Sequence, residues 1–147
     1  MQFSSIVRRN EQQAVLKQAA KNRLVNFAEI VRRDYVASWH HDILCSKLQE
    51  GYERLKHGVS SRIIIEMPPR HGKSVTATEL FPAWVLGHDP SVPNIVSAHT
   101  ADLAQDFGLA TRDIMNEPNY QAIFGTKLRD DTRAKGKWMT EGGGGYT

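Results

Sequence analysis

The segment from Ile63 to Ser74 constrains the fold of this chain more than any other stretch of the sequence. Three consecutive isoleucines lead into a loop that contains two prolines, an arginine and a histidine and that ends in Gly72-Lys73-Ser74. A run of β-branched residues is typical of a strand that is covered on both faces. Together with the helical pattern that follows, the segment predicts a buried strand, a tight loop and the start of a helix.

The end of this loop matches the last residues of the phosphate-binding pattern G-x-x-x-x-G-K-[ST]. Gly72 allows the backbone to approach a phosphate closely, and the amides of a helix N-terminus favour an anion. Lys73 can reach the β- and γ-phosphates of a nucleotide, and the Ser74 hydroxyl can ligate Mg²⁺. The predicted nucleotide-binding residues of the loop are Pro69, Arg70, His71, Gly72, Lys73, Ser74 and Val75.

One position of the loop departs from the pattern. The first glycine is replaced by Met67, and Pro68 and Pro69 follow it without an N–H to donate. A chance Gly-Lys-Ser at a strand–helix turn is the alternative explanation of this loop, because motif matches carry a false-positive risk.

The chain beyond the loop alternates between helix and strand patterns. A helix is expected from Lys73 to Gly87, and Pro82 should kink it because proline lacks an N–H and crowds the preceding turn. A short strand at 94–98 and a helix capped by Thr100 follow. This order is typical of an α/β protein with a parallel sheet, helices on both faces and a right-handed crossover.

Residues 1–60 carry helical patterns only. One helix is expected from about Asn10 to 32–34, and Ser38 is the expected cap of a second helix that ends at Gly58. Trp39 or His40 is a candidate for stacking on an adenine base, but the residues alone favour Trp39 as an anchor of the helix entry. The adjacent histidines do not predict a zinc site, because neighbouring residues on a helix do not face each other.

The last part of the sequence is less regular. A short helical turn ending at Gly125 and a strand at 138–140 are expected. The four glycines at 142–145 fit either a flexible tail or a loop that needs close backbone approach. Five basic residues that alternate with aspartates fit either a contact to a nucleic-acid backbone or a solvated loop: Lys127, Arg129, Arg133, Lys135 and Lys137.

Composition narrows the class of protein without deciding the function. Of the 147 residues, 40% are hydrophobic and 24% are charged, which suits a globular protein with a core. The net charge of +3 permits nucleic-acid contact but does not demonstrate it. The single cysteine, Cys45, is expected to be a buried thiol, and the sequence shows neither a membrane span nor a secretory signal. We therefore expect a cytoplasmic setting.

A second acidic motif is missing from the sequence. An ATPase of this kind needs a carboxylate after an apolar strand to hold Mg²⁺ and often a glutamate to orient the attacking water. The only apolar run that ends in an acid leads to Glu66, and that run already feeds the phosphate loop. Asp89 and Asp102 fit better as a turn former and as a partner of a helix dipole.

Several motifs in this order resemble the N-terminal ATPase portion of the large terminase subunit of tailed bacteriophages and prophages. The resemblance runs from about residue 27 to the end of the chain. It is carried by Trp39-His40-His41, the loop from Met67 to Ser74, Phe81-Pro82-Ala83-Trp84-Val85-Leu86-Gly87, Ser97-Ala98-His99-Thr100 with Leu103-Ala104, and the glycine-rich stretch from Trp138 to Tyr146.

The resemblance implies an α/β fold with a P-loop NTPase-like parallel sheet, of which only the N-terminal part is expected here. Residues 1–60 are then a helical segment and 61–147 the start of the ATPase domain. Such terminases often lack the first glycine of the loop and carry an arginine inside it. Lys73 and Arg70 are thus the expected catalytic residues, with Arg70 stabilising the γ-phosphate; the alternative for Arg70 is an ion pair with a neighbouring carboxylate. ATP and Mg²⁺ are the implied cofactors, with Trp39 and His40 near the adenine and Ser74 on the metal.

The same resemblance implies partners and a setting. They are double-stranded DNA, a portal protein, the small terminase subunit and further copies of the chain in the full motor, in the cytoplasm of a bacterial host, with no membrane involved. The family's acidic motif and nuclease domain would follow Thr147, so we expect a truncated gene, a split gene product or an expressed fragment. Little or no hydrolysis by this chain alone is expected. The alternatives are a non-catalytic terminase remnant that serves as an interaction protein, and another P-loop enzyme such as a helicase or a small-molecule kinase.

Overall fold

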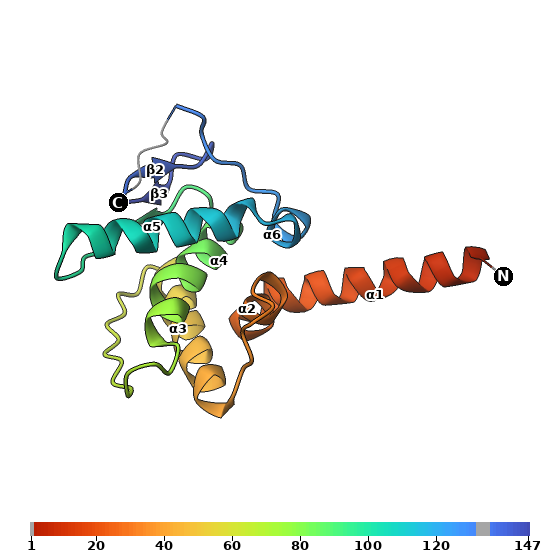
Figure 1. The fold of residues 1–147 in the computed structure, drawn as a ribbon, viewed down its shortest axis with the longest axis horizontal. Coiled ribbons are helices and arrows are strands. Elements are labelled where there is room, and N and C mark those ends of the chain that lie inside the picture. Colours follow the sequence, from red (N-terminus) through yellow and green to blue (C-terminus); the bar gives the residue numbers. More distant parts are fainter. Residues whose placement is uncertain (1, 132–135) are drawn as a thin grey trace.

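The protein is mostly helical and carries a small mixed three-stranded sheet (Figure 1). The computed structural model describes residues 2–131 and 136–147. Within these ranges, every helix is either too short or too polar to cross a membrane.

The N-terminal segment forms three helices rather than the two that the sequence predicts. Helix α1 spans Gln2–Asn22 and α2 spans Leu24–Val31, so the helix expected from Asn10 onwards begins earlier and breaks at Arg23, whose backbone is extended. The break is stabilised from the next helix, because the Leu24 N–H donates to Gln49 Oε1 at 2.8 Å. This donor would otherwise be one of the unpaired amides at a helix start.

Helix α3 spans Trp39–Lys56 and confirms the prediction of a helix capped by Ser38. The Ser38 N–H donates to Nδ1 of His41 at 3.2 Å, so His41 takes the place that glutamate or glutamine has in a capping box. Gly58 follows the helix with φ +73°, the left-handed conformation expected of a helix-terminating glycine. Cys45 on this helix is buried and free, as expected.

The helix after the loop runs from 73 to 88 and changes its pitch before the proline. Val75–Leu80 form a π-helix, η1, and Phe81–His88 continue as α4. The Phe81 N–H donates to the Thr76 carbonyl, one residue further back than in an α-helix. In a regular helix the amide of residue 82 would donate to the Thr78 carbonyl, but Pro82 has none. The wider turn is the distortion that the sequence predicts at this proline.

The two C-terminal helices confirm their predictions. Helix α5 spans Ala101–Asn116, and the Thr100 side chain accepts a hydrogen bond from the Leu103 N–H at 3.3 Å. Helix α6 spans Pro118–Ile123, and Gly125 follows with φ +70°.

The sheet is mixed, and its strands are short. Strand β1 is Pro93–Asn94, β2 is Trp138–Met139 and β3 is Gly145–Tyr146, in the order β1-β3-β2. β3 pairs in parallel with β1 and antiparallel with β2, so the expectation of a parallel sheet holds for one pair only. The expected strand at 94–98 is shortened, although the Val96 N–H still donates to the Thr147 carbonyl at 2.8 Å.

The glycine-rich stretch packs closely rather than forming a tail. A Cβ at Gly144 would lie 2.5 Å from the Ser91 carbonyl carbon and 2.5 Å from the Val92 oxygen. The chain can therefore lie against the turn before β1 only without side chains here. Of the basic residues expected nearby, Arg133 and Lys135 lie outside the described residues, and Arg129 Nε donates to Asp131 at 2.9 Å.

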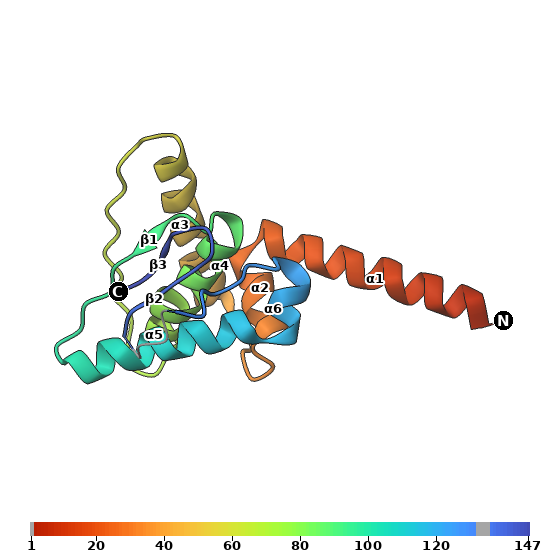
Figure 2. The ribbon, with the colours of Figure 1, turned by 90° about the horizontal axis from the view of Figure 1, so that it is seen from above.

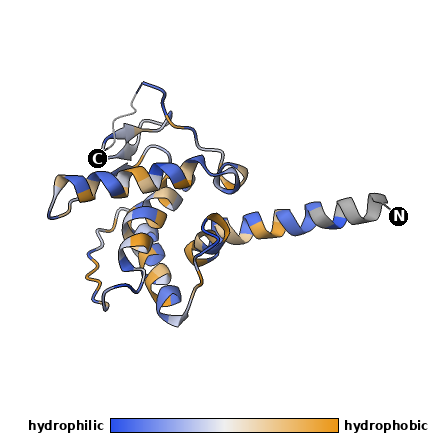
Figure 3. Cartoon of the chain, in the orientation of Figure 1, coloured by the Kyte–Doolittle hydropathy of each residue, from blue (hydrophilic) through white to orange (hydrophobic). Residues whose placement is uncertain are grey.

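The predicted strand from Arg62 to Glu66 does not form. Residues 59–68 belong to no helix or strand, and the side chain of Ile64 is 88% exposed. The segment runs as an extended connection along one edge of the molecule, where hydrophobic residues are open to solvent (Figure 3). β-propensity expresses a fit to neighbouring strands and a covered face; Ile65 packs against the core, but no strand pairs with this segment among the residues that the structure describes.

Residues from both halves of the chain build one core. The Trp84 indole N–H donates to the Ala20 carbonyl at 3.1 Å, and Phe27 packs edge-on against Tyr120 with ring centroids 6.0 Å apart. Helix α5 lies beside the sheet, where the Trp138 indole N–H donates to the Gly108 carbonyl at 2.9 Å (Figure 2). The division into 1–60 and 61–147 stays a prediction, and the two parts share this core.

Candidate functional site

The loop at 67–74 turns the chain through two left-handed residues. Arg70 has φ +63° and Gly72 has φ +74°, and Arg70 is the only non-glycine residue with positive φ in the part of the chain that the structure describes. Such a conformation is costly for a residue with a side chain, and residues in it concentrate at functional sites. The loop therefore carries backbone strain where the sequence predicts a binding site.

Past Gly72 the chain enters the helix directly. The Gly72 carbonyl accepts the Thr76 N–H at 2.9 Å, so the amides of residues 73–75 form the first turn, where amides have no partner within a helix. Lys73 is partly buried and Ser74 is exposed. This end of the helix combines unpaired donors, a positive dipole end and a lysine, which are the groups that bind an anion.

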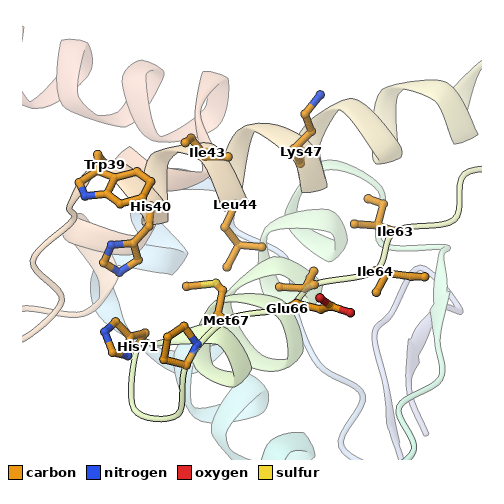
Figure 4. A pocket seen from close by; sticks show the side chains of 12 residues that line it. Trp39, His40, Ile43, Leu44, Lys47, Ile63, Ile64, Glu66, Met67 and His71 are labelled. Atoms are coloured by element: carbon orange, nitrogen blue, oxygen red, sulfur yellow. The ribbon is translucent and has the colours of Figure 1, made fainter.

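An apolar groove lies on one side of the loop, between α3 and the extended segment (Figure 4). Its volume is about 730 Å³. Leu44 and Met67 face each other across its middle, and Trp39, His40 and His71 close one end. The full lining is Trp39, His40, Ile43, Leu44, Lys47, Ile63, Ile64, Ile65, Glu66, Met67, Pro68 and His71.

A smaller and more polar cavity, of about 350 Å³, borders the same loop. We call it the loop pocket. Its lining is Arg32, Asp34, Tyr35, Val36, His40, His41, Arg70, His71, Gly72 and Val75. His40 and His71 line both the groove and this pocket, so the two cavities meet at these rings.

Three histidine rings gather where the loop meets α3. The ring centroids of His40 and His41 lie 4.1 Å apart, and those of His40 and His71 lie 5.7 Å apart. Nδ1 of His71 lies 2.9 Å from the Pro69 carbonyl, a bond that holds the loop's turn together. Burial lowers the pKa of His41 below 6.5, and the neighbouring rings of His40 and His71 lower it further.

Two buried contacts hold the helix behind the loop. The hydroxyls of Tyr35 and Thr76 lie 3.0 Å apart, and burial raises the pKa of Tyr35 to about 12. Arg32 Nη1 donates to Glu79 Oε2 at 3.0 Å. Burial raises the pKa of Glu79, and the charge of Arg32 opposes this rise. Both contacts connect the segment before α3 to η1, so they set the direction in which the loop enters its helix.

The structure brings most, but not all, of the predicted residues together. Arg70, His71, Gly72 and Val75 line the loop pocket, His40 lines both cavities, and Trp39 lines the groove. The three that line neither cavity are Pro69, Lys73 and Ser74. Arg70 is not paired with any carboxylate in the salt bridges of the described residues, so its expected alternative as an ion-pair partner is not what this geometry shows.

Sequence reasoning missed Arg32, Tyr35 and His41 as neighbours of the loop. Arg32 and Tyr35 come from a connection that carries no motif, so no sequence signal points to them. His41 had a signal, because it stands three residues after Ser38, the position at which a side chain can cap the helix start.

The residues at the loop fit a nucleotide phosphate group better than a metal ion alone. Arg70, Lys73 and the first-turn amides form a donor set for phosphate oxygens. The hydroxyl of Ser74 is one oxygen ligand, and no group of three acidic, histidine or cysteine side chains able to hold a metal exists among the residues described. Mg²⁺ usually binds through substrate phosphates, water and few protein ligands, so the Ser74 hydroxyl alone would not hold it.

Comparisons with models of protein families, with curated proteins and with solved structures find no match to this chain.

Proposed function

We propose that this chain binds ATP with Mg²⁺ at the loop 67–74 and is the ATP-binding part of a viral DNA-packaging motor, the large terminase subunit. The observation that carries the proposal is the strained loop itself: Arg70 and Gly72 in left-handed conformations lead straight into a helix at Gly72-Lys73-Ser74. The groove beside it offers an aromatic and apolar surface, and Trp39 is 76% exposed there. In this proposal, the small mixed sheet and its helices are the incomplete core of a P-loop NTPase-like domain.

Each loop residue has a role in the proposal. Lys73 contacts the β- and γ-phosphates, and the hydroxyl of Ser74 ligates Mg²⁺. The guanidinium of Arg70 pairs with γ-phosphate oxygens, for which a planar cation with several donors is suited. Trp39 or His40 stacks on the adenine at the closed end of the groove. The bound ion supplies charge neutralisation of the phosphates, and the chain's own residues bind and orient the nucleotide.

The proposal assigns binding, rather than hydrolysis, to this chain. Glu66 lines the groove but belongs to the segment that leads into the loop, and Glu79 is engaged by Arg32. In the complete motor, hydrolysis would move double-stranded DNA, held through its backbone, into a capsid. The portal protein, the small terminase subunit and further copies of the chain are the proposed partners, in the cytoplasm of a bacterial host.

Calorimetric titration with ATP and Mg²⁺ tests the proposal. We expect the natural chain to bind weakly, to hydrolyse ATP negligibly, and to lose at least about tenfold in affinity on Lys73→Ala, which is about 1.4 kcal/mol. Lys17→Ala on α1 is the matched control and should leave the affinity unchanged. Equal binding by the natural chain and Lys73→Ala would contradict the assignment of the loop, and fast turnover would show that an acid has been overlooked.

The position of Lys73 and Ser74 outside both cavities favours a second candidate function. In that case the chain is a non-catalytic interaction protein that keeps terminase surfaces for a portal protein or the small subunit. Failure to bind ATP analogues, together with retention of a portal protein or small subunit in a pull-down, would support this candidate over the first.

A further inference from the structure

His41 joins two parts of the molecule that are distant in sequence. Its Nδ1 accepts the Ser38 N–H at 3.2 Å and so closes the start of α3. Its Nε2 points at the loop, because a Cβ placed on Gly72 would lie 2.7 Å from this atom. The ring therefore fills the space above Gly72 that a larger residue would need.

The hydrogen bond to Ser38 decides which form of the ring fits. An imidazole nitrogen accepts a hydrogen bond only when it carries no proton, so Nδ1 is unprotonated and the neutral ring carries its proton on Nε2. Protonation of Nδ1 would turn an acceptor into a donor that faces another donor. It would also place a positive charge at the N-terminus of a helix, where cations are disfavoured.

The surroundings of the ring offer a positive charge two neutral acceptors, the Ser38 hydroxyl at 3.1 Å and the backbone of His71, but no unpaired carboxylate. The titratable or charged groups around it are Arg32, Asp34 and Tyr35 on the preceding segment, His40 and Asp42 on α3, and Arg70 and His71 on the loop. The carboxylate of Asp34 pairs with Arg32 at 3.5 Å, and that of Asp42 pairs with Arg23. The other groups are cationic or neutral, so they either repel an imidazolium or provide no negative charge to attract it.

We propose that His41 is a pH-sensitive latch: its neutral ring closes the start of α3 while it lies over Gly72, and protonation breaks the contact with the Ser38 N–H and puts a charge beside the loop. The proposal does not depend on what the loop binds. The proposed switch lies where the loop pocket meets α3, and Arg70 and Gly72 of the strained turn line the same pocket.

The pH window follows from the direction of the pKa shift. The pKa of His41 lies below 6.5 in the folded protein because burial disfavours its charged form, and His40 and His71 act in the same direction. The unfolded chain therefore takes up the proton first as the pH falls. The contribution of the latch is complete above about 6.5 and is lost as the pH falls from there through the lower value of the folded protein.

Nuclear magnetic resonance of the ¹⁵N-labelled chain, without nucleotide, tests the latch. We expect the His41 ring to show the Nε2-protonated neutral form at pH 8 and to titrate with a midpoint below 6.5. The amide resonances of Ser38 and Gly72 should move with that same midpoint. Local resonances are required, because burial also lowers the pKa of His88, which titrates in the same window but contacts Lys21 instead.

Two variants separate His41 from its neighbours. In His41→Gln the side chain can still accept from Ser38, as glutamine does in a capping box, but it cannot titrate, so the shift of Gly72 should vanish. In His40→Gln the shift should remain and its midpoint should rise, because one repelling ring is gone. A Gly72 amide that does not respond to pH in the natural chain, or a shift that persists in His41→Gln, would overturn the proposal. Should His41→Gln fail to fold, the titration of the natural chain alone still decides.

Since no nucleotide is present, failure of this test leaves the proposed ATP site untouched, and failure of the calorimetric test leaves the latch untouched.

Discussion

At the scale of single residues, the carbonyl of Thr78 shows how a local defect is repaired from a distance. Pro82 removes the amide that would donate to this carbonyl in a regular helix. The Tyr146 hydroxyl donates to it at 3.0 Å, and the Thr111 hydroxyl lies 3.3 Å away, with the Phe107 carbonyl as its nearer acceptor at 2.9 Å. The two side chains come from β3 and α5, so one unpaired helix carbonyl connects the helix after the loop to the sheet and to α5.

Replacement of Tyr146 by phenylalanine tests this repair. Tyr146→Phe should lower the free energy of unfolding by about 1–2 kcal/mol, because a buried carbonyl loses its shorter hydrogen bond. Urea denaturation followed by circular dichroism measures the change.

The control repeats Tyr146→Phe in a chain that also carries Pro82→Ala, because alanine restores an N–H near the Thr78 carbonyl. There the loss caused by Tyr146→Phe should be smaller by about 0.5 kcal/mol or more, the kind of coupling that a double-mutant cycle detects. Equal losses in both backgrounds would mean that the tyrosine hydroxyl stabilises the fold independently of Pro82, since phenylalanine keeps the ring that stacks on Trp138.

At the scale of elements, the helix boundaries follow from short local signals. Ser38 and Thr100 precede α3 and α5, and the left-handed residues Gly58 and Gly125 follow α3 and α6. Each of these signals acts through the backbone of its own helix, so it is legible in the sequence without knowledge of the fold.

The cap of α5 gives a prediction at this scale. Thr100→Ala should lower the free energy of unfolding by about 1 kcal/mol, because the Leu103 N–H loses its acceptor. Thr100→Ser retains a hydroxyl and should stay within about 0.5 kcal/mol of the natural chain. If both variants lose the same amount in urea denaturation, the methyl group of the threonine, rather than its oxygen, carries the effect.

The strands behave differently, because their existence depends on partners. Trp138–Met139 was predicted as a strand and forms one, since Gly145–Tyr146 returns beside it. The three isoleucines before the loop have a stronger β-propensity, yet they stay unpaired. The residue pattern of a segment indicates that the segment can form a strand. Whether it does so depends on a pairing partner from a distant part of the chain.

At the scale of the whole molecule, α1 divides into a part that projects and a part that packs (Figure 1). The residues at 10–16 are exposed, and Val15 is 68% exposed. Toward its C-terminal end, Ala20 is fully buried, and the carbonyls of Ala20 and Lys21 accept from Trp84 and His88 at 3.1 and 2.9 Å. The end of α1 thus closes the core over α4.

Deletions from the N-terminus should reveal this division. Removal of residues 1–13 should change the melting temperature by less than about 2 °C, because residues 10–13 are exposed and the described hydrogen bonds of α1 to the core lie further along the helix. Removal of residues 1–21 should lower it by about 4–8 °C, since one buried and one exposed hydrogen bond and the buried Ala20 are lost, and 1 kcal/mol corresponds to about 2–4 °C in a chain of this size. Equal effects of the two deletions in a calorimetric scan would show that α1 stabilises the fold along its whole length.

The sequence by itself determined most helices of this protein, though not the break between α1 and α2, and it determined the caps of α3 and α5, the glycine at the sharp turn before Lys73 and the buried thiol, because these depend on residues a few positions apart. Only the tertiary structure decided that the isoleucine segment stays unpaired, that the sheet is mixed, and that Arg32, Tyr35 and His41 surround the loop. These features depend on which distant segments meet, and that choice minimises the free energy of the whole chain rather than of any one stretch. The loop at Gly72 combines both kinds of feature. Its own residues predict a binding site, and the position of His41 from helix α3 beside Gly72 is visible only in the tertiary structure.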